Sequence, residues 1–335
     1  MKHIPNSNYF LILLAAAAGL ILSTCSSGSN QPIDPTYVIN FAQGTFPTSV
    51  TNFSDANSEY DDYNVALPPM ITMSFPLSFS SNRATHGGTF DFVGVQVLIS
   101  FNQYDGYFYL SGYPQTSELA YLNTPANEFG PYIMNLPDGR KIYLYASDQT
   151  GNLDIYFTDP VTGQPHPAAM LNSSYDDAYP TFGPDNAIYF TSNREGNFHI
   201  YRAEIPEGAD IPTWLATATT ATITRMDVLN STGNDKCPSI NGNLMVFTSD
   251  RTGGYGGFDL WYSTHGLDGW STPVNLGPSI NTAYDEYRPE VVYAPNFTND
   301  LMFFSSNRPG GKGGFDLYYA GIPKLTSLSA ESPWF

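Results

Sequence analysis

The chain has 335 residues, with 24 Tyr, 22 Phe and 4 Trp, and it carries 31 Asp and Glu against 13 Lys and Arg for a formal net charge of −18. This aromatic and apolar content argues against disorder. The acidic balance argues against a nucleic-acid partner, because no basic surface is available to displace counterions, and it favours cations or basic partners.

The N-terminus predicts a secretory signal. Lys2 and His3 precede an apolar run over residues 9–22, which is too short for a confident membrane span, and small residues follow. The run Leu-Ser-Thr-Cys at 22–25 resembles the lipobox of bacterial lipoproteins. We therefore predict a lipoprotein signal peptide over residues 1–24, lipidation of Cys25 and a flexible tether over 25–45. An ordinary cleaved signal peptide is the alternative.

Because Ser26 rather than Asp follows the cysteine, the known sorting of lipoproteins favours the outer membrane, with its periplasmic or cell-surface side left open. Cys237 then has no disulfide partner and is expected to be a small buried hydrophobe.

The central feature of the sequence is an internal repeat. Residues 190–201, 247–262 and 304–319 share an aromatic residue, a Ser-Asn/Asp-Arg run, a Gly-containing turn and a second aromatic segment, and residues 79–92 and 145–156 are weaker copies. Both halves of each copy alternate apolar and polar residues, which predicts a β-hairpin and not a helix.

A second signature precedes each hairpin, namely an Asn followed five residues later by a carboxylate. The five pairs are Asn57/Asp62, Asn123/Glu128, Asn172/Asp177, Asn230/Asp235 and Asn281/Glu286. In the last four, a Pro follows three residues after the carboxylate, which suits a strand position whose N–H the ladder does not need. With segments such as 270–276 as outer strands, four antiparallel strands recur about every 45–65 residues, as in propeller blades.

The two ends of the repeat region predict ring closure. Residues 48–51 and 57–63 parallel residues 272–275 and 281–287 at a constant offset. We therefore expect an all-β, five-bladed β-propeller over residues 46–322, closed by an N-terminal strand in the last blade, with a C-terminal tail over 323–335. A six-bladed propeller is the alternative, because the first interval is the longest and residues 101–109 suit an insertion or a degenerate blade.

These motifs resemble the WD40-like repeat of TolB-type β-propellers, which occurs in many bacterial cell-envelope proteins. The resemblance covers about residues 48–320 and is closest in the last two copies. It implies a propeller that acts as a protein-binding or scaffold module, and family membership does not settle function.

The resemblance also places the first strand of each repeat nearest the central channel. Asp62, Glu128, Asp177, Asp235 and Glu286 would then form an acidic ring at one channel mouth, able to hold Ca²⁺ or a basic peptide end. The alternative is architectural: each carboxylate bonds backbone N–H groups or a repeat arginine. Those arginines are Arg83, Arg194, Arg251 and Arg308, and Gln149 stands in the second copy.

Other recurring groups favour structural roles. Asp91, Asp154, Asp259 and Asp316, with His199 in the remaining copy, are expected to bond turn amides within their hairpins. The Gly-Gly-x-Gly-Gly turns are expected to need positive φ. Tyr104, Tyr107, Tyr109 and Tyr255 could stack on sugars or peptides, although packing between blades is the more usual role of such aromatics.

Catalytic signatures are absent from the sequence: it contains neither Gly-x-Ser-x-Gly nor His-Glu-x-x-His, and its histidines are scattered. We therefore expect a non-catalytic binding or scaffold lipoprotein that engages an envelope protein or a glycan through the channel mouth or the loops. A glycoside hydrolase using channel carboxylates is the enzyme alternative, and an accessory subunit of an outer-membrane complex is a third possibility. No cofactor is expected apart from Ca²⁺.

Overall fold

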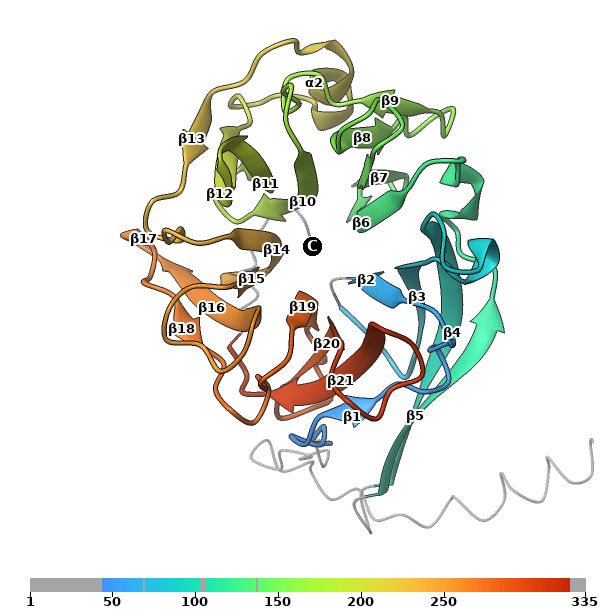
Figure 1. Cartoon of the computed structure of the whole chain (residues 1–335). Helices are drawn as coiled ribbons and strands as arrows, with labels where there is room; N and C mark the ends of the chain where they lie inside the picture. Colours follow the sequence, from blue (N-terminus) through green and yellow to red (C-terminus); the bar gives the residue numbers. More distant parts are fainter. Residues whose placement is uncertain (1–43, 69, 103–106, 137, 326–335) are drawn as a thin grey trace, which may run out of the picture. The chain divides into compact units, whose positions relative to one another are not determined.

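Five antiparallel sheets surround one axis in the computed structural model (Figure 1). The structure describes residues 44–68, 70–102, 107–136 and 138–325. The predicted signal peptide, Cys25 and most of the tether lie outside the described residues, as do residues 326–335 of the tail. The all-β, five-bladed propeller is confirmed, with five blades and not six.

The strands of each blade run from the axis outward. The first blade contains β2 (Asp62–Ala66), β3 (Ser74–Ser81), β4 (Asp91–Asn102) and β5 (Tyr107–Gln115). The second contains β6 (Glu128–Asn135), β7 (Lys141–Ser147), β8 (Asp154–Thr158) and β9 (Pro165–Pro167). The third contains β10 (Asp177–Gly183), β11 (Ala187–Glu195), β12 (Asn197–Glu204) and β13 (Ile223–Arg225).

The last two blades follow the same plan. The fourth contains β14 (Asp235–Asn241), β15 (Leu244–Ser249), β16 (Asp259–Gly266), β17 (Gly269–Trp270) and β18 (Val274–Asn275). The fifth contains β19 (Glu286–Val292), β20 (Asp300–Ser306), β21 (Asp316–Ile322) and β1 (Thr51–Asn52). The outer strand predicted at 270–276 is thus split into β17 and β18, which both pair with β16.

Helix is minor, as expected. It is limited to α2 (Ile211–Thr217) and the 3₁₀ turns η1 (Arg83–Thr85) and η2 (Ala120–Leu122) among the described residues. None of the described helices is long and apolar enough to cross a membrane.

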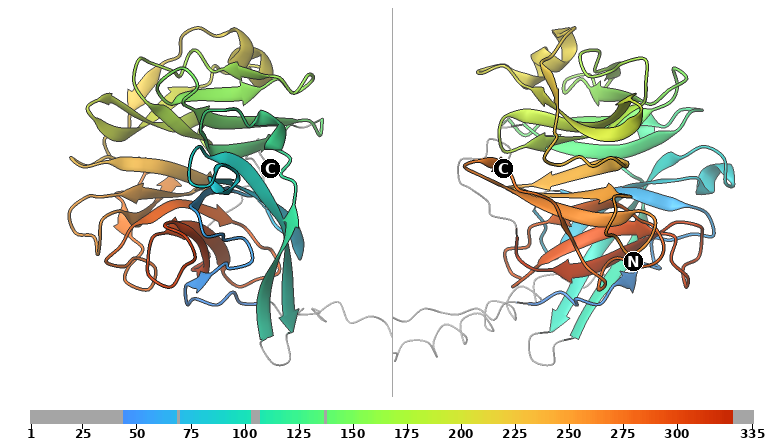
Figure 2. Two further views of the ribbon diagram at one scale, coloured as in Figure 1. Left: turned by 45° about the vertical axis from the view of Figure 1, so that its right-hand side comes forward. Right: turned by 60° about the vertical axis from the view of Figure 1, so that its left-hand side comes forward.

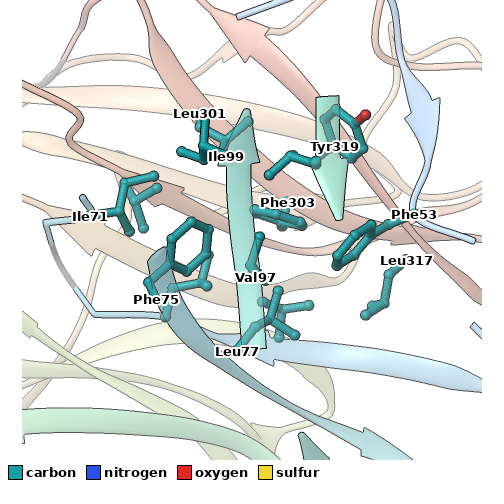
Figure 3. Close-up of a cluster of buried hydrophobic side chains, with 14 of the residues drawn as sticks. Phe53, Ile71, Phe75, Leu77, Val97, Ile99, Leu301, Phe303, Leu317 and Tyr319 are labelled. Atoms are coloured by element: carbon teal, nitrogen blue, oxygen red, sulfur yellow. The ribbon is translucent and has the colours of Figure 1, made fainter. Parts of the chain in front are cut away.

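The N-terminal segment closes the ring as predicted. In β1, Thr51 pairs with Tyr319 and Asn52 with Tyr318 of β21. Buried apolar side chains then join the first and fifth blades, with Phe53, Leu77, Val97 and Phe303 in one cluster (Figure 3). Closure pairs a sheet edge that an open array would expose.

Each inner strand contains a bulge that the sequence analysis did not anticipate. The third residue of the strand has positive φ in all five blades, and four of these residues are not glycine: Asn64 (61°), Gly130 (54°), Tyr179 (55°), Cys237 (54°) and Arg288 (46°). The register shifts at this point in every blade. The repeat prolines lie within the bulge, where the ladder does not need their N–H, and not at the strand entry. Two of the left-handed residues, Cys237 and Arg288, instead donate their N–H groups to Thr191 and Thr248 of the preceding blade, each at 3.1 Å.

The long first interval is explained by strand length. β4 and β5 pair along residues 94–102 and 107–115 and run on beyond the neighbouring strands (Figure 2). Residues 101–102 and 107–109 therefore belong to the first blade.

The glycine-rich turns need glycine for two different reasons. Gly253 and Gly310 have φ values of 94° and 97°, as expected. Gly256 and Gly313 do not have positive φ. They lie against backbone carbonyls of the next blade, of Thr282 and Tyr284 in one case and of Tyr60 in the other, where a Cβ would clash.

Candidate functional site

The five carboxylates of the predicted acidic ring are the first residues of the five inner strands. All five are fully buried. Each accepts hydrogen bonds from the backbone N–H and the hydroxyl group of a Ser or Thr four residues earlier, as Asp177 does from Ser173 at 2.6 and 2.7 Å. Their proposed role in holding Ca²⁺ or a basic peptide end stays a prediction.

In four blades an arginine completes this arrangement. In the fifth blade Arg308 donates from Nη2 to Glu286 and to the backbone oxygen of Ile280, both at 2.8 Å, and from Nε to Ser306 at 3.1 Å. Its guanidinium carbon lies 5.2 and 5.0 Å from the ring centres of Phe304 and Tyr318. Arg83, Arg194 and Arg251 pair with Asp62, Asp177 and Asp235 in the same way.

The second blade lacks the arginine. Glu128 accepts hydrogen bonds from the Thr124 hydroxyl at 2.5 Å and from Ser147 at 3.4 Å, and Gln149 is exposed. Burial without a cation raises the pKa of Glu128 to about 7, although the Thr124 bonds oppose the rise.

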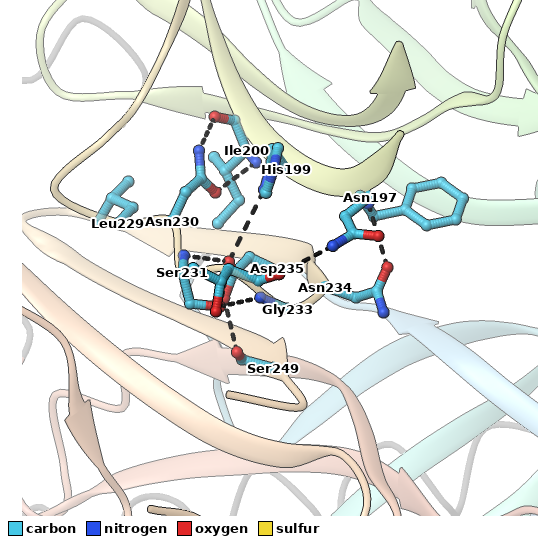
Figure 4. Close-up of polar contacts among 12 residues, drawn as sticks. Asn197, His199, Ile200, Leu229, Asn230, Ser231, Gly233, Asn234, Asp235 and Ser249 are labelled. Carbon is cyan, nitrogen blue, oxygen red and sulfur yellow. Dashed lines mark hydrogen bonds and ion pairs between the residues drawn. The ribbon is translucent and has the colours of Figure 1, made fainter. Parts of the chain in front are cut away.

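The repeat asparagines staple neighbouring blades together, a role that the sequence analysis did not assign. Asn230 accepts the Ile200 N–H at 2.8 Å and donates to the Ile200 carbonyl at 2.9 Å, next to the Asp235 cluster (Figure 4). The other four pairs are Asn57 with Leu317, Asn123 with Phe92, Asn172 with Ile155 and Asn281 with Leu260. The fixed spacing from Asn to carboxylate therefore places one staple and one buried acid at every blade junction.

The third-strand acids differ among the blades. Asp259 and Asp316 accept turn N–H groups, as expected, for example from Tyr255 and Lys312. Asp154 instead accepts the Thr150 hydroxyl. Burial raises the pKa of Asp91. His199 takes the equivalent position in the third blade, and its Nδ1 lies 4.0 Å from Asp235.

Half-buried aromatic side chains gather at the end of the propeller where the inner strands begin. They either follow the inner-strand acid or precede the third-strand residue, and we call them the aromatic mouth: Tyr63, Phe90, Phe129, Phe198, Phe258, Tyr287 and Phe315.

Six of the seven rings lie close to another ring of the set, and most of these pairs cross a blade boundary. Tyr63 lies 4.9 Å from Phe90, 5.7 Å from Phe129 and 5.9 Å from Phe315, measured between ring centres. Tyr287 lies 5.5 Å from Phe258. Lys236 belongs to the same surface, with its Nζ 3.9 Å from the ring centre of Phe198. The apolar residue before each third-strand acid was visible in the sequence, but its convergence with the inner-strand aromatics was not.

Beyond the aromatic mouth, side chains fill the axis. Tyr179, Cys237 and Arg288 are at most 7% exposed. Arg288 reaches across from the fifth blade, with Nη2 3.3 Å from the carbonyl of Pro131 in the second blade and its guanidinium carbon 5.9 Å from the Tyr179 ring centre. Cys237 is a buried free cysteine, as expected, and burial raises its pKa to about 11.

One carboxylate near the axis does not belong to the repeat. Glu290 occupies the fifth position of β19, where the other inner strands have Ala66, Tyr132, Thr181 and Ser239. It accepts a hydrogen bond from Ser239 at 2.9 Å and lies 3.2 Å from Arg288. Burial raises its pKa to about 7 against the opposing effect of Arg288. Because it has no counterpart in the other repeats, the repeat pattern did not point to it.

The remaining aromatic candidates are not among the seven rings of the aromatic mouth. Tyr109 and Tyr255 are 46% and 50% exposed. Tyr104 and the side chain of Tyr107 lie outside the described residues. Within the described part of the chain, no group of three or more His, Cys, Asp or Glu side chains is arranged to hold a metal ion.

Comparison with known proteins bears on the fold alone. No family model matches the sequence, and no curated protein matches it. A thermostable family-43 glycoside hydrolase superposes with a TM-score of 0.50 at 12% identity, covering 81% of this chain and 96% of that chain. An endo-arabinase from Bacteroides thetaiotaomicron VPI-5482 gives 0.49 at 13% identity, covering 85% of this chain and 99% of that chain. TolB from Acinetobacter baumannii gives 0.41 at 15% identity, covering 80% of this chain and 56% of that chain. At 12% identity, the likeness to the family-43 glycoside hydrolase supports the propeller fold and says nothing of activity. The chain is therefore assigned to the β-propellers by its fold and to no narrower family.

Proposed function

We propose that this chain is a non-catalytic binding lipoprotein of the bacterial cell envelope, which engages a protein partner through its aromatic mouth. The observation that carries the proposal is the convergence of seven half-buried rings from all five blades at one end of the axis. Partly exposed aromatic side chains in a contiguous group are typical of surfaces that bind protein partners.

The surroundings of the aromatic mouth favour a protein over a glycan. Tyr63 and Phe90 meet edge to face at 88°, and Phe258 and Tyr287 at 89°. The polar side chains of Asn127, Asp176 and Asp285 are already engaged, since they accept backbone N–H groups of the preceding blade. A glycan site needs polar groups that are free to bond hydroxyls.

The buried carboxylates support a non-catalytic role. A glycosidase needs two carboxyl groups flanking the scissile bond. The five repeat acids are instead fully buried and bonded to serine or threonine, and four of them also to arginine. The axis between the aromatic mouth and Glu290 is filled by Tyr179, Cys237 and Arg288.

The envelope location rests on the predicted lipidation of Cys25 and an outer-membrane address. Cys25→Ser should abolish incorporation of labelled palmitate and release the protein from membranes. Retention of label by that variant would contradict the lipid anchor.

The binding role is tested by capture from native membranes, with mass spectrometry of what is retained. Phe129→Ala with Tyr287→Ala should lose the partner, which the wild type and a Tyr113→Ala control retain. Tyr113 is an exposed aromatic on β5, outside the aromatic mouth. Circular dichroism checks that each variant is folded. Equal capture by all three proteins contradicts the proposal. A captured partner that belongs to no outer-membrane complex would argue against the role of accessory subunit.

A glycoside hydrolase is the second candidate, and the raised pKa of Glu290 favours it. A screen of aryl-glycosides and oligosaccharides with the wild type and Glu290→Gln discriminates. Turnover by the wild type that Glu290→Gln abolishes would establish this candidate and overturn the non-catalytic reading.

A further inference from the structure

The second blade retains the groups that hold a guanidinium in the other four blades. Each filled site contains a serine hydroxyl, an inner-strand carboxylate and a backbone carbonyl just before the stapling asparagine; we call this set of acceptors the arginine socket. In the fourth blade these are Ser249, Asp235 and the carbonyl of Leu229, all bonded to Arg251 at 2.5–3.0 Å.

The second blade has each of these groups at the equivalent position. Ser147, Glu128 and the carbonyl of Leu122 correspond to Ser306, Glu286 and the carbonyl of Ile280 in the fifth blade. Glu128 and Glu286 are the same residue type with the same threonine partner four residues earlier. The second and fifth blades are therefore a matched pair that differs by the arginine.

The aromatic part of the socket is also retained. In the third and fifth blades the arginine lies over two nearly parallel rings, whose centres are 6.0 and 6.1 Å apart at 30° and 24°. In the second blade Tyr145 and Tyr156 are 5.7 Å apart at 25°. Gln149, at the position of the missing arginine, is exposed, and among the described residues no hydrogen bond joins it to Glu128 or Ser147.

We propose that the second-blade arginine socket binds a guanidinium group from outside the chain, namely the arginine side chain of a protein partner. Nε and Nη2 of one planar guanidinium match the hydroxyl, carboxylate and carbonyl acceptors, whereas an ammonium group lacks this fork and stacks less well. The net charge of −18 favours a basic partner.

The socket lies at the end of the propeller that carries the aromatic mouth, because Glu128 and Phe129 are adjacent. The proposal does not depend on that surface. In the filled sockets the arginine side chains are 12–31% exposed, so the sockets open to the protein surface. Glu128 and Ser147 are fully buried, so a guanidinium can enter only if the groups that cover them move aside.

The test uses capped arginine (N-acetyl-arginine amide) as the probe at about pH 8, where the Glu128 carboxyl is ionised. Isothermal titration calorimetry should detect one site of millimolar affinity on the purified mature protein. Capped lysine should bind at least about tenfold more weakly than capped arginine. Gln149→Arg fills the socket from within and should remove the site, whereas Gln149→Met, of similar length and neutral, should retain it.

Arg308→Gln supplies the reciprocal test, because it empties the matched socket of the fifth blade. The number of capped-arginine sites should rise from one to two in a variant shown to be folded by circular dichroism. The proposal is overturned if the wild type binds no capped arginine, if Gln149→Arg binds it as well as the wild type does, or if lysine and arginine bind equally. None of these results bears on the aromatic mouth, which the capture experiment tests separately.

Discussion

The second and fifth blades both have a glutamate at the first position of the inner strand, Glu128 and Glu286, but the two glutamates have different partners. Glu286 pairs with Arg308 at 2.8 Å, whereas the partners of Glu128 among the described residues are hydroxyl and N–H groups. The strand pairing and the asparagine staple are the same in both blades. The second blade thus forms without the ion pair and keeps the same strand pairing and asparagine staple.

The largest expected effect comes from making the fifth blade resemble the second. Arg308→Met should lower the free energy of unfolding by about 3 kcal/mol near pH 8, because it leaves the buried Glu286 ionised without a cation. Urea denaturation followed by circular dichroism measures this. A loss below about 1 kcal/mol would show that the ion pair contributes little to the scaffold.

The second largest expected effect concerns the asparagine staple, which both blades have. Asn281→Ala should cost about 2 kcal/mol, because the backbone N–H and C=O of Leu260 both lose their side-chain partner. Asn123→Ala should cost a similar amount in the second blade, where Phe92 is the partner. The exposed Asn296→Ala is the control and should change stability by less than about 0.5 kcal/mol. Unequal losses in the two blades would mean that the staple depends on the arginine.

The converse change makes the second blade resemble the fifth, and its effect depends on pH. The pKa of Glu128 is raised from 4.5 to about 7, so its contribution to stability is fully present below about pH 4.5 and is lost as pH rises through about 7. An arginine at 149 pairs with the ionised carboxylate and should offset that loss. Gln149→Arg should therefore stabilise the protein by about 1 kcal/mol at pH 8 and by less at pH 5, measured by urea denaturation. Equal stabilisation at both pH values would show that the introduced arginine does not pair with the Glu128 carboxylate.

The smallest expected effect concerns Ca²⁺ at the five repeat acids. Each carboxylate already has hydroxyl and N–H partners, and four have arginine, so millimolar Ca²⁺ should shift the melting temperature by less than about 1 °C. A clear rise that Asp177→Ala with Glu286→Ala abolishes would instead support the acidic ring as a cation site.

Much of the fold could be predicted because its signals are local. Alternating strands, turn glycines and the Asn-to-carboxylate spacing recur along the chain, and the offset between residues 57–63 and 281–287 predicted the pairing of β1 with β21. The acids and arginines were predicted as candidates, but their burial was not, since burial depends on the neighbouring blade.

The sequence alone determined the all-β class and the ring closure of this protein and favoured five blades over six, because each blade carries its own hydrogen-bonding and apolar pattern. Only the tertiary structure decided what lies on the axis and at its mouth. Arg288, Glu290 and Tyr179 stand at repeat positions that hold a different residue in every other blade, and the rings of the aromatic mouth come from all five blades. Such residues meet because five strands distant in sequence converge on one axis, a geometry that no local pattern specifies.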